Sequence, residues 1–460
     1  MQARPKQFRY GTLAAAVVLA LGPATASAAA FQLLEQGAKG QGTSFSGTAT
    51  NWEDTATAFW NPAGMARHTE RSVTVGGSVI DVSFDFEDDG STLTDFTTQP
   101  PGRTGFADAT ENTDAGETAF VPNFYYIQPL QNGLTAGFAI NVPFGLESDY
   151  DEEWVGRYHA TNSELTTINF NPSIAYQLND SVSVGAGINI QYAEATLANR
   201  VDPEAAGPEV LGSTPGDFGA RGDPSNDSDA KIEGDNWGAG LNLGLLADIT
   251  DRTRLGIAYR GHVTHSVDGD IDYNHRNDAF AATADTADVF VDADAAATLD
   301  LPETLTISMS RDSTRLENVT IKADVTWTRW SRLDELKVEF DSEQPDTEET
   351  LDFEDTTRLA LGATWDATPE WQLRTGIAYD QSPVKDAESR SPRIPDSNRR
   401  WFSLGFGYQP VGSDFELDVG YSHIRVDDTS INRTNDFGDN LRGDYESSVD
   451  ILAVQGLWRF

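Results

Sequence analysis

The sequence predicts an all-β fold: a transmembrane antiparallel β-barrel of about 14 strands with an N-terminal hatch, or plug. From about residue 72 onward, apolar residues recur at every second position, which is typical of strands with two differently solvated faces. The segments between them are alternately long and short. Only 38% of the residues are hydrophobic and the mean hydropathy is -0.43, which is too polar for a bundle of membrane helices. A closed barrel needs only one apolar residue in two and leaves no unpaired edge in lipid.

The composition excludes several classes of protein. The 460 residues include no cysteine, which removes disulfide scaffolds, thiolate zinc sites and cysteine nucleophiles. With 32 basic against 73 acidic residues, the net charge of -41 argues against a nucleic-acid partner. The six histidines lie in no G-x-S-x-G or H-E-x-x-H motif. We therefore expect no enzyme activity, no metal and no cofactor.

Residues 1–28 have the organisation of a secretory signal peptide. Basic residues precede an apolar run over residues 13–21, and Ala26-Ser27-Ala28 has the pattern of a cleavage site. The run is shorter than the roughly 20 residues that span a bilayer, which argues against the alternative, an anchor helix. An exported protein is expected.

Residues 29–71 interrupt the alternation and are rich in glycine. They include Asn61-Pro62-Ala63-Gly64, and glycines with a proline suit the tight turns of a folded insert. We predict that this segment is the hatch and that residues 72–460 form the barrel around it.

The barrel strands are predicted from the alternating segments. They lie near residues 72–86, 117–129, 133–146, 164–178, 181–198, 234–249, 253–267, 300–311, 317–330, 352–367, 370–381, 399–410, 413–427 and 446–460. Long connections alternate with tight turns along this series, as in barrels whose short turns face the periplasm and whose long loops face the medium. A soluble β-sandwich also alternates along its strands, but it has no reason to keep this rhythm of loops.

Aromatic residues near the strand ends predict the girdles of a membrane barrel, although strand propensity alone is an alternative for each. They are Tyr176, Tyr192, Trp237, Tyr259, Trp327, Trp330, Trp371, Tyr408 and Tyr421. In the last strand, Val454 and Trp458 are expected to face lipid, so Val449, Ile451 and Leu457 face inward. An apolar interior favours oily cargo over polar solutes, unless these residues pack against the hatch.

One predicted strand contains a proline. Pro143 cannot donate to the strand ladder, and Gly137, Phe144 and Gly145 lie near it. We interpret this as a kink that opens a window in the wall; the alternative is that Pro143 only ends the strand. A change of apolar parity between Val79 and Ile80 predicts a bulge elsewhere.

Four stretches of the chain resemble the outer-membrane long-chain fatty acid transporter family, the FadL/TodX-type channels for hydrophobic compounds. They are the mature start at Phe31-Gln32-Leu33-Leu34-Glu35-Gln36, the motif Asn61-Pro62-Ala63, the kink at Pro143-Phe144-Gly145-Leu146, and residues 374–384 followed by Arg393-Ile394-Pro395-Asp396 and Arg399. The resemblance covers essentially the whole mature sequence.

The resemblance implies a function as well as a fold. It implies passive uptake: a hydrophobic ligand is captured outside, a hatch gates the lumen, and the ligand leaves sideways into the membrane. Phe31, Asn61, Pro62, Ala63 and Gly64 would belong to the gating hatch, and Gly137, Pro143, Phe144 and Gly145 to the lateral opening. Capture would use loops 199–233 and 268–299, which here are acidic with interspersed apolar residues such as Val210 and Phe290.

A fatty-acid carboxylate in the lumen needs a cation. Strand parity places Arg260, Lys322, Arg358 and Arg374 inward, and Lys337 matches a lysine of the family pattern. Each could instead be the lumenal partner of Asp324, Asp366 or Asp380. Glu194 stands where the family has an arginine, which favours a neutral ligand such as an alkane or an aromatic hydrocarbon.

These features together predict a monomeric transporter of hydrophobic compounds in the outer membrane of a Gram-negative bacterium. Long-chain fatty acids are the first expected ligand and hydrocarbons the second. Expected partners are that ligand, outer-membrane lipid and, during biogenesis, the barrel-assembly machinery. An outer-membrane hydrolase and an adhesin barrel are the alternatives from other classes.

Overall fold

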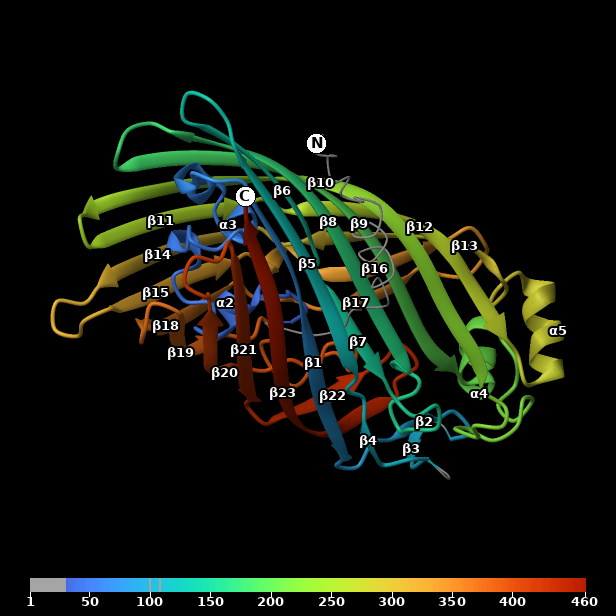
Figure 1. The fold of residues 1–460 in the computed structure, drawn as a ribbon. Coiled ribbons are helices and arrows are strands. Elements are labelled where there is room, and N and C mark those ends of the chain that lie inside the picture. The colour runs from blue at the N-terminus through green and yellow to red at the C-terminus, as the bar shows by residue number, and fades with distance from the viewer. Residues whose placement is uncertain (1–29, 99–100, 107–108) are drawn as a thin grey trace, which may run out of the picture.

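The computed structural model describes residues 30–98, 101–106 and 109–460. The expected signal peptide lies outside these residues. The described chain forms a closed antiparallel barrel of 14 strands, which confirms the predicted fold. Closure occurs between β1 (Ser72–Asp88) and β23 (Asn440–Arg459), which pair continuously from Ser72 opposite Arg459 to Asp88 opposite Gly443 (Figure 1).

Several wall strands are interrupted and continue in line as a second segment. Between β1 and β23 the wall consists of β5 (Thr118–Pro129), β6 (Leu134–Asn141) with β7 (Gly145–Asp149), β8 (Asn162–Gln177), β9 (Val182–Val201), β10 (Ser228–Thr250), β11 (Thr253–Arg260) with β12 (Val263–Asn274), β13 (Ala293–Leu301) with β14 (Thr304–Asp312), β15 (Val319–Thr328) with β16 (Glu335–Phe340), β17 (Thr347–Thr350) with β18 (Thr356–Asp366), β19 (Trp371–Asp380), β20 (Arg399–Tyr408), and β21 (Phe415–Val426) with β22 (Thr429–Thr434). The first outer loop adds β2 (Leu93–Asp95), β3 (Gly102–Thr104) and β4 (Asn112–Asp114).

The outer surface of the barrel carries an apolar belt. Leu241 is 56% exposed and Leu404 is 63% exposed, as expected of side chains that face lipid. Trp237 and Trp371 are exposed at the ends of this belt, as the predicted girdles require. The girdle prediction is wrong for Trp330, because its side chain is fully buried inside the barrel.

The predicted bulge in β1 is wrong. β1 pairs with β23 without a shift of register, so every second residue keeps facing the lumen. Val79 is exposed toward lipid, whereas Ile80, Phe84 and Phe86 face inward and are buried. The apolar residues change from the outer to the inner face of β1 because the part of the strand after Val79 lies outside the membrane. Its outer face there meets water.

Two expected loops are shorter than the sequence indicated. β10 begins at Ser228, and β12 runs to Asn274, so much of 199–233 and 268–299 is strand that extends beyond the membrane. The loops that remain carry α4 (Pro203–Ala206), η4 (Gly207–Leu211) and α5 (Asp278–Ala287) at the outer end of the barrel (Figure 1).

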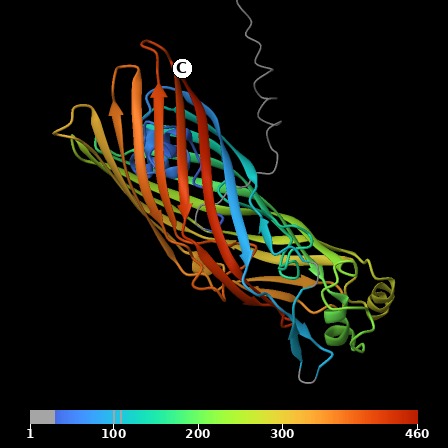
Figure 2. The same cartoon turned by 90° about the horizontal axis from the view of Figure 1, so that it is seen from below.

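The hatch fills the barrel at the end with the short turns (Figure 2). It consists of α2 (Ala38–Gln41), η2 (Thr48–Thr50), α3 (Thr57–Trp60) and η3 (Pro62–Arg67). The wall approaches it through glycines: a Cβ at Gly244 would overlap Oδ1 of Asn61, and one at Gly376 would overlap the backbone of Thr43. The small residues of the inward parity therefore make room for the hatch.

No helix among the described residues is long and apolar enough to span a membrane.

Candidate functional site

An apolar chamber lies in the lumen on the outer side of the hatch. Its cavity volume is about 100 Å³. Aliphatic side chains of neighbouring strands build its wall: Leu165, Leu197, Val267, Leu299, Leu336 and Val338. The hatch residue Phe31 also lines the chamber, and its ring centroid lies 5.0 Å from that of Trp330. An oily chain could lie in this chamber without losing contact with apolar surface.

A polar collar separates the chamber from the outer mouth of the barrel. Arg393 and Glu349 line both spaces, and Nε of Arg393 lies 3.2 Å from Oε2 of Glu349. The Nη atoms of Arg393 donate to the carbonyl oxygens of Asn162 at 3.1 Å and His159 at 3.0 Å. Arg433 lies 3.6 Å from Glu349. In the sequence, Arg393 is part of a stretch that resembles the family but has no predicted role. The structure shows that it organises this collar.

The collar predicts a pH dependence of the outer loops. Burial, and then the charge of Arg433, lower the pKa of His159 to about 4. The ordinary histidine pKa is about 6.5, so between these values the unfolded loop binds more protons than the folded one and the loop loses stability as the pH falls. We expect a change from pH 7 to pH 5 to destabilise the loop by on the order of 1 kcal/mol, seen as faster proteolysis. A His159→Gln variant should lose most of this dependence; an unchanged dependence in that variant would contradict the assignment.

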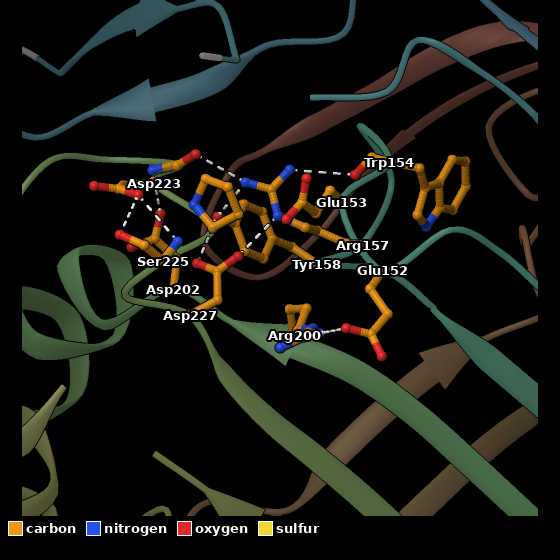
Figure 3. Close-up of polar contacts among 12 residues, drawn as sticks. Glu152, Glu153, Trp154, Arg157, Tyr158, Arg200, Asp202, Asp223, Ser225 and Asp227 are labelled. Carbon is orange, nitrogen blue, oxygen red and sulfur yellow. Dashed lines mark hydrogen bonds and ion pairs between the residues drawn. The ribbon is translucent and has the colours of Figure 1, made fainter. Parts of the chain in front are cut away.

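A buried ion pair and its hydrogen bonds fix the loop before β8 to the loop before β10 (Figure 3). Nε of Arg157 lies 2.8 Å from Oδ2 of Asp227, and the Tyr158 hydroxyl donates to Oδ1 of the same carboxylate at 2.9 Å. Nη2 of Arg157 also donates to the carbonyl oxygen of Gly222 at 2.8 Å. The carboxylate of Asp202 accepts from the backbone N–H of Gly222 at 2.7 Å. The mouth therefore has a fixed wall on this side.

The apolar residues of the acidic outer loops divide into two groups. Phe280 is fully buried against Phe218, with ring centroids 5.4 Å apart, so it holds the loops together. Val210, Tyr273 and Phe290 line the outer mouth. Only this second group is placed to contact a ligand.

The wall has a window where β6 gives way to β7. β6 pairs with β5 up to Ile140 opposite Phe124, whereas β7 pairs only with β8. Contact with the neighbouring chain resumes at Asp149, whose N–H donates to the carbonyl oxygen of Ala115 at 3.2 Å. Between these two points, strand-to-strand hydrogen bonds are missing on one side.

The predicted kink residues do not all lie at the window. Pro143 and Phe144 occupy the break between β6 and β7, and Gly145 begins β7. Gly137 lies within the paired part of β6, where a Cβ would overlap Sδ of Met65 in the hatch. It provides space for the hatch and is not part of the kink.

The start of the hatch covers the window from inside. The N–H of Leu33 donates to the carbonyl oxygen of Pro143 at 2.9 Å, and that of Gly145 donates to Phe31 at 3.0 Å. These bonds make Gln32 and Phe144 an antiparallel pair. The hatch segment 31–36 thus takes the place of the missing strand partner.

The Asn61-Pro62-Ala63-Gly64 motif locks the hatch to the wall. Nδ2 of Asn61 donates to the carbonyl oxygens of Ala49 at 2.6 Å and Leu245 at 3.0 Å, while Oδ1 accepts from the N–H of Ala63 at 3.1 Å. Asn61 thereby caps η3, and Pro62 stands at its first position, where its missing N–H is not needed. Gly64 packs closely against Thr57.

Three of the five candidate cations donate hydrogen bonds to the hatch. Nζ of Lys322 donates to Oδ1 of Asn51 at 3.1 Å, Nη2 of Arg358 to the carbonyl oxygen of Ser44 at 2.7 Å, and Nη2 of Arg260 to that of Phe59 at 2.5 Å. Two arginines also face carboxylates of the wall: Nη2 of Arg374 lies 2.6 Å from Oδ1 of Asp418, and Nε of Arg358 lies 3.7 Å from Oδ2 of Asp380. Asp324 instead accepts hydrogen bonds from the backbone of Gly47 and Thr48.

Arg260 and Arg358 line a second, smaller chamber with a volume of about 30 Å³. The guanidinium of Arg260 lies 3.7 Å from the ring centroid of Phe59, and its Nη1 donates to Oδ1 of Asn189 at 2.6 Å. Residues 32–34 of the hatch also line this chamber, and the adjoining Phe31 lines the first.

Two residues do not face the lumen as expected. Lys337 pairs with Glu339 at 2.7 Å on the outer face of β16, opposite the chamber-lining Leu336 and Val338. Glu194 is exposed on the outer face of β9, within 3.3 Å of the Tyr192 hydroxyl. Glu194 therefore places no negative charge in the lumen, and it does not argue for a neutral ligand.

A closed barrel with an apolar chamber and an internal hatch is typical of an outer-membrane channel for hydrophobic compounds. Among the described residues, no cluster of histidine and carboxylate side chains could hold a metal ion. The model of the family described as "Outer membrane protein transport protein (OMPP1/FadL/TodX)" matches residues 19–460. The chain belongs to this family of outer-membrane transport proteins.

Known relatives extend over nearly the whole chain. The chain is 30% identical to outer membrane protein P1 of Haemophilus influenzae over 448 residues, 94% of each protein. It is 30% identical to the long-chain fatty acid transport protein of Escherichia coli over 437 residues, 91% of this chain and 93% of the relative.

Solved structures agree with the fold. A Pseudomonas aeruginosa FadL homologue superposes with a TM-score of 0.83 at 25% identity. The match covers 94% of this chain and 100% of that structure. The Pseudomonas putida toluene transporter TodX gives a TM-score of 0.64 at 16% identity, covering 88% of this chain and 94% of that structure. The likeness to the second structure concerns the fold alone.

Proposed function

We propose that the protein takes up long-chain fatty acids by capture at the outer mouth, storage in the apolar chamber, displacement of the first hatch segment and lateral release through the window. The apolar chamber carries this proposal, because its lining is apolar and a charged collar guards its entrance. Each buried CH₂ group contributes about 0.8 kcal/mol, so the chamber favours a long chain over a short one.

The second chamber supports an acid as the ligand. Arg260 and Arg358 are the two candidate cations that line this second chamber, and the hatch segment 31–34 lines both it and the apolar chamber. A guanidinium in a water-poor site binds a carboxylate much more strongly than in water. A bound acid would therefore compete with the hatch for this position. The relative named as a long-chain fatty acid transport protein supports the same ligand.

Uptake of hydrocarbons by the same route is the second candidate. The chamber itself needs no polar group on its ligand, and a solved structure with the same fold is named as a toluene transporter. The two candidates differ in what they require of the arginines. Only an acid would use Arg260 and Arg358.

We further propose that residues 1–28 are removed on export and that residues 29–71 act as the hatch of a barrel formed by residues 72–460. The barrel-assembly machinery inserts the protein into the outer membrane. There it works as a monomer surrounded by lipid. The apolar belt supports the contact with lipid.

Filling the chamber tests the proposed function. Ala297 lines it, so an Ala297→Trp variant should insert an indole into the space and lower uptake of radiolabelled oleate by about tenfold. An Arg260→Met variant should weaken oleate binding by about tenfold but leave binding of hexadecane unchanged, because the lost contact is to the carboxylate.

Folding of both variants is checked by the heat-dependent shift of the barrel on an electrophoresis gel. Leu241→Met on the lipid-facing surface is the control. Normal oleate uptake by folded Ala297→Trp would contradict the proposal, and equal loss of oleate and hexadecane binding in Arg260→Met would favour a neutral ligand.

A further inference from the structure

The lower edge of the window is polar on its inner face. β5 and β6 separate after the pair Phe124 and Ile140, so the next residues in register are Asn123 and Asn141. Asn123 is only 4% exposed, and Asn141 is fully buried. Two amide side chains thus face the lumen at the position where β5 and β6 separate. A cargo that leaves through the window passes this position.

Several polar atoms at this edge have no hydrogen-bond partner in the described part of the chain. They are Oδ1 and Nδ2 of Asn123, Nδ2 of Asn141, Oε1 of Gln36 and Oγ of Ser78. Ser78 lies on β1, whose Gly76 is opposite Asn123, and Gln36 belongs to the hatch segment that covers the window. A buried polar group without a partner is unfavourable, so it is normally retained for a reason.

The residues around these atoms are satisfied only in part. Oδ1 of Asn141 accepts from Asn169 at 2.9 Å, whereas its Nδ2 has no partner. Nε2 of Gln36 donates to the carbonyl oxygen of Val142 at 2.7 Å, and the Tyr125 hydroxyl donates to the carbonyl oxygen of Gln36 at 2.7 Å. Both carboxyl oxygens of Glu35, the preceding residue of the hatch segment, also lack a hydrogen-bond partner.

The chemistry of this set selects its ligand. It offers the amide N–H groups of Asn123 and Asn141 as donors, two amide oxygens that only accept, and a hydroxyl that can do either. An un-ionised carboxylic acid supplies a carbonyl oxygen for Nδ2 of Asn123 and an O–H for an amide oxygen. An ionised carboxylate has no hydrogen for the amide oxygens, and a hydrocarbon satisfies none of the atoms.

We propose that Asn123, Gln36 and Ser78 form an exit subsite that binds the neutral head group of the departing ligand, a protonated carboxylic acid or an alcohol. This inference rests on the proposed lateral release. In the closed state the hatch seals the subsite, and movement of segment 31–36 exposes it beside the lipid. The acid is received there in the un-ionised form that enters a bilayer.

The test compares ligands that share a chain and differ in the head group. Purified full-length protein is reconstituted in liposomes, and entry of oleic acid, oleyl alcohol and 8-heptadecene is measured together with the Kd of oleate in detergent. The variants are Asn123→Leu and Ser78→Ala. The control is Thr135→Val, which changes a buried residue on the same inner face of β6 away from the window.

The inference predicts a loss confined to transport of ligands with a head group. Asn123→Leu should slow entry of oleic acid and oleyl alcohol by about fivefold, and Ser78→Ala by about twofold, with the Kd of oleate and the entry of 8-heptadecene unchanged. Thr135→Val should behave as wild type.

Other results would overturn the inference. They are unchanged entry of oleic acid in both folded variants, or equal slowing of all three probes, which would mean that the side chains only support the wall. Failure of wild-type protein to move oleic acid at all would instead overturn the proposed function. The two failures are therefore distinguishable.

Discussion

A Gln32→Cys/Phe144→Cys variant loses oleate uptake when oxidised and regains it when reduced. The two residues form an antiparallel pair flanked by the hydrogen bonds of Leu33 and Gly145, the arrangement in which Cα atoms lie about 4.5 Å apart and a disulfide can form. Such a bond stabilises the closed state by about 2–4 kcal/mol, so the open fraction and the uptake should fall by roughly 30-fold or more. The measurement is uptake of radiolabelled oleate by whole cells.

The chain provides a clean background for this experiment, because it contains no cysteine. Each single variant treated with the same oxidant should keep its uptake. If the disulfide is shown to form and uptake stays at the reduced level, the hatch segment does not have to leave the window and the gating mechanism is wrong.

A Gly244→Val variant should turn the closed channel into a leak for polar solutes. The added side chain would overlap Oδ1 of Asn61, which caps η3 and holds the hatch to Ala49 and Leu245. Breaking this buried network removes several hydrogen bonds of about 1 kcal/mol each and leaves their partners unsatisfied. We expect a rise in single-channel conductance in planar bilayers and increased sensitivity of cells to hydrophilic antibiotics.

The neighbouring change Leu243→Val is the matched control, since Leu243 is half exposed on the lipid-facing surface. It should leave the conductance at the wild-type level. A wild-type conductance in folded Gly244→Val would show that closure by the hatch does not depend on the Asn61 contact.

The sequence predicts the membrane part of the fold well because lipid imposes a strict pattern on it. In β10, Leu241 and Leu243 face lipid, whereas Asn242 is buried on the inner face and Gly244 lies against the hatch; this difference is visible as period two. Outside the membrane the pattern fades. Asp268, Asp270 and Asp272 lie on the water-facing side of β12, so a paired strand there has the composition of a loop.

The candidate site was predictable only in part. Parity correctly placed Arg260 and Arg358 inward, and the same rule applied to β9 would have placed Glu194 outward. The window could be suspected from Pro143, but its closure by the hatch depends on residues far apart in sequence, such as Leu33 and Pro143. No local pattern shows which inward arginine meets empty space and which meets a carboxylate.

The central claim is that the cargo leaves sideways through the window, and the alternative is exit into the periplasm. The short-turn end of the barrel has an open vestibule lined by Trp52, Arg67 and His68, through which a cargo could reach the periplasm instead of the membrane. Lateral exit passes Phe120 of β5, which lies on the outer surface beside the window and is 42% exposed.

Photo-crosslinking in intact outer membranes with a fatty acid that carries a diazirine near its methyl end distinguishes these routes most directly. The account predicts labelled peptides from the apolar chamber and from the Phe120 region of β5, with the Phe120 label lost when the Gln32→Cys/Phe144→Cys variant is oxidised. Labelling of the vestibule around Trp52 and His68, with none near Phe120, would contradict lateral release.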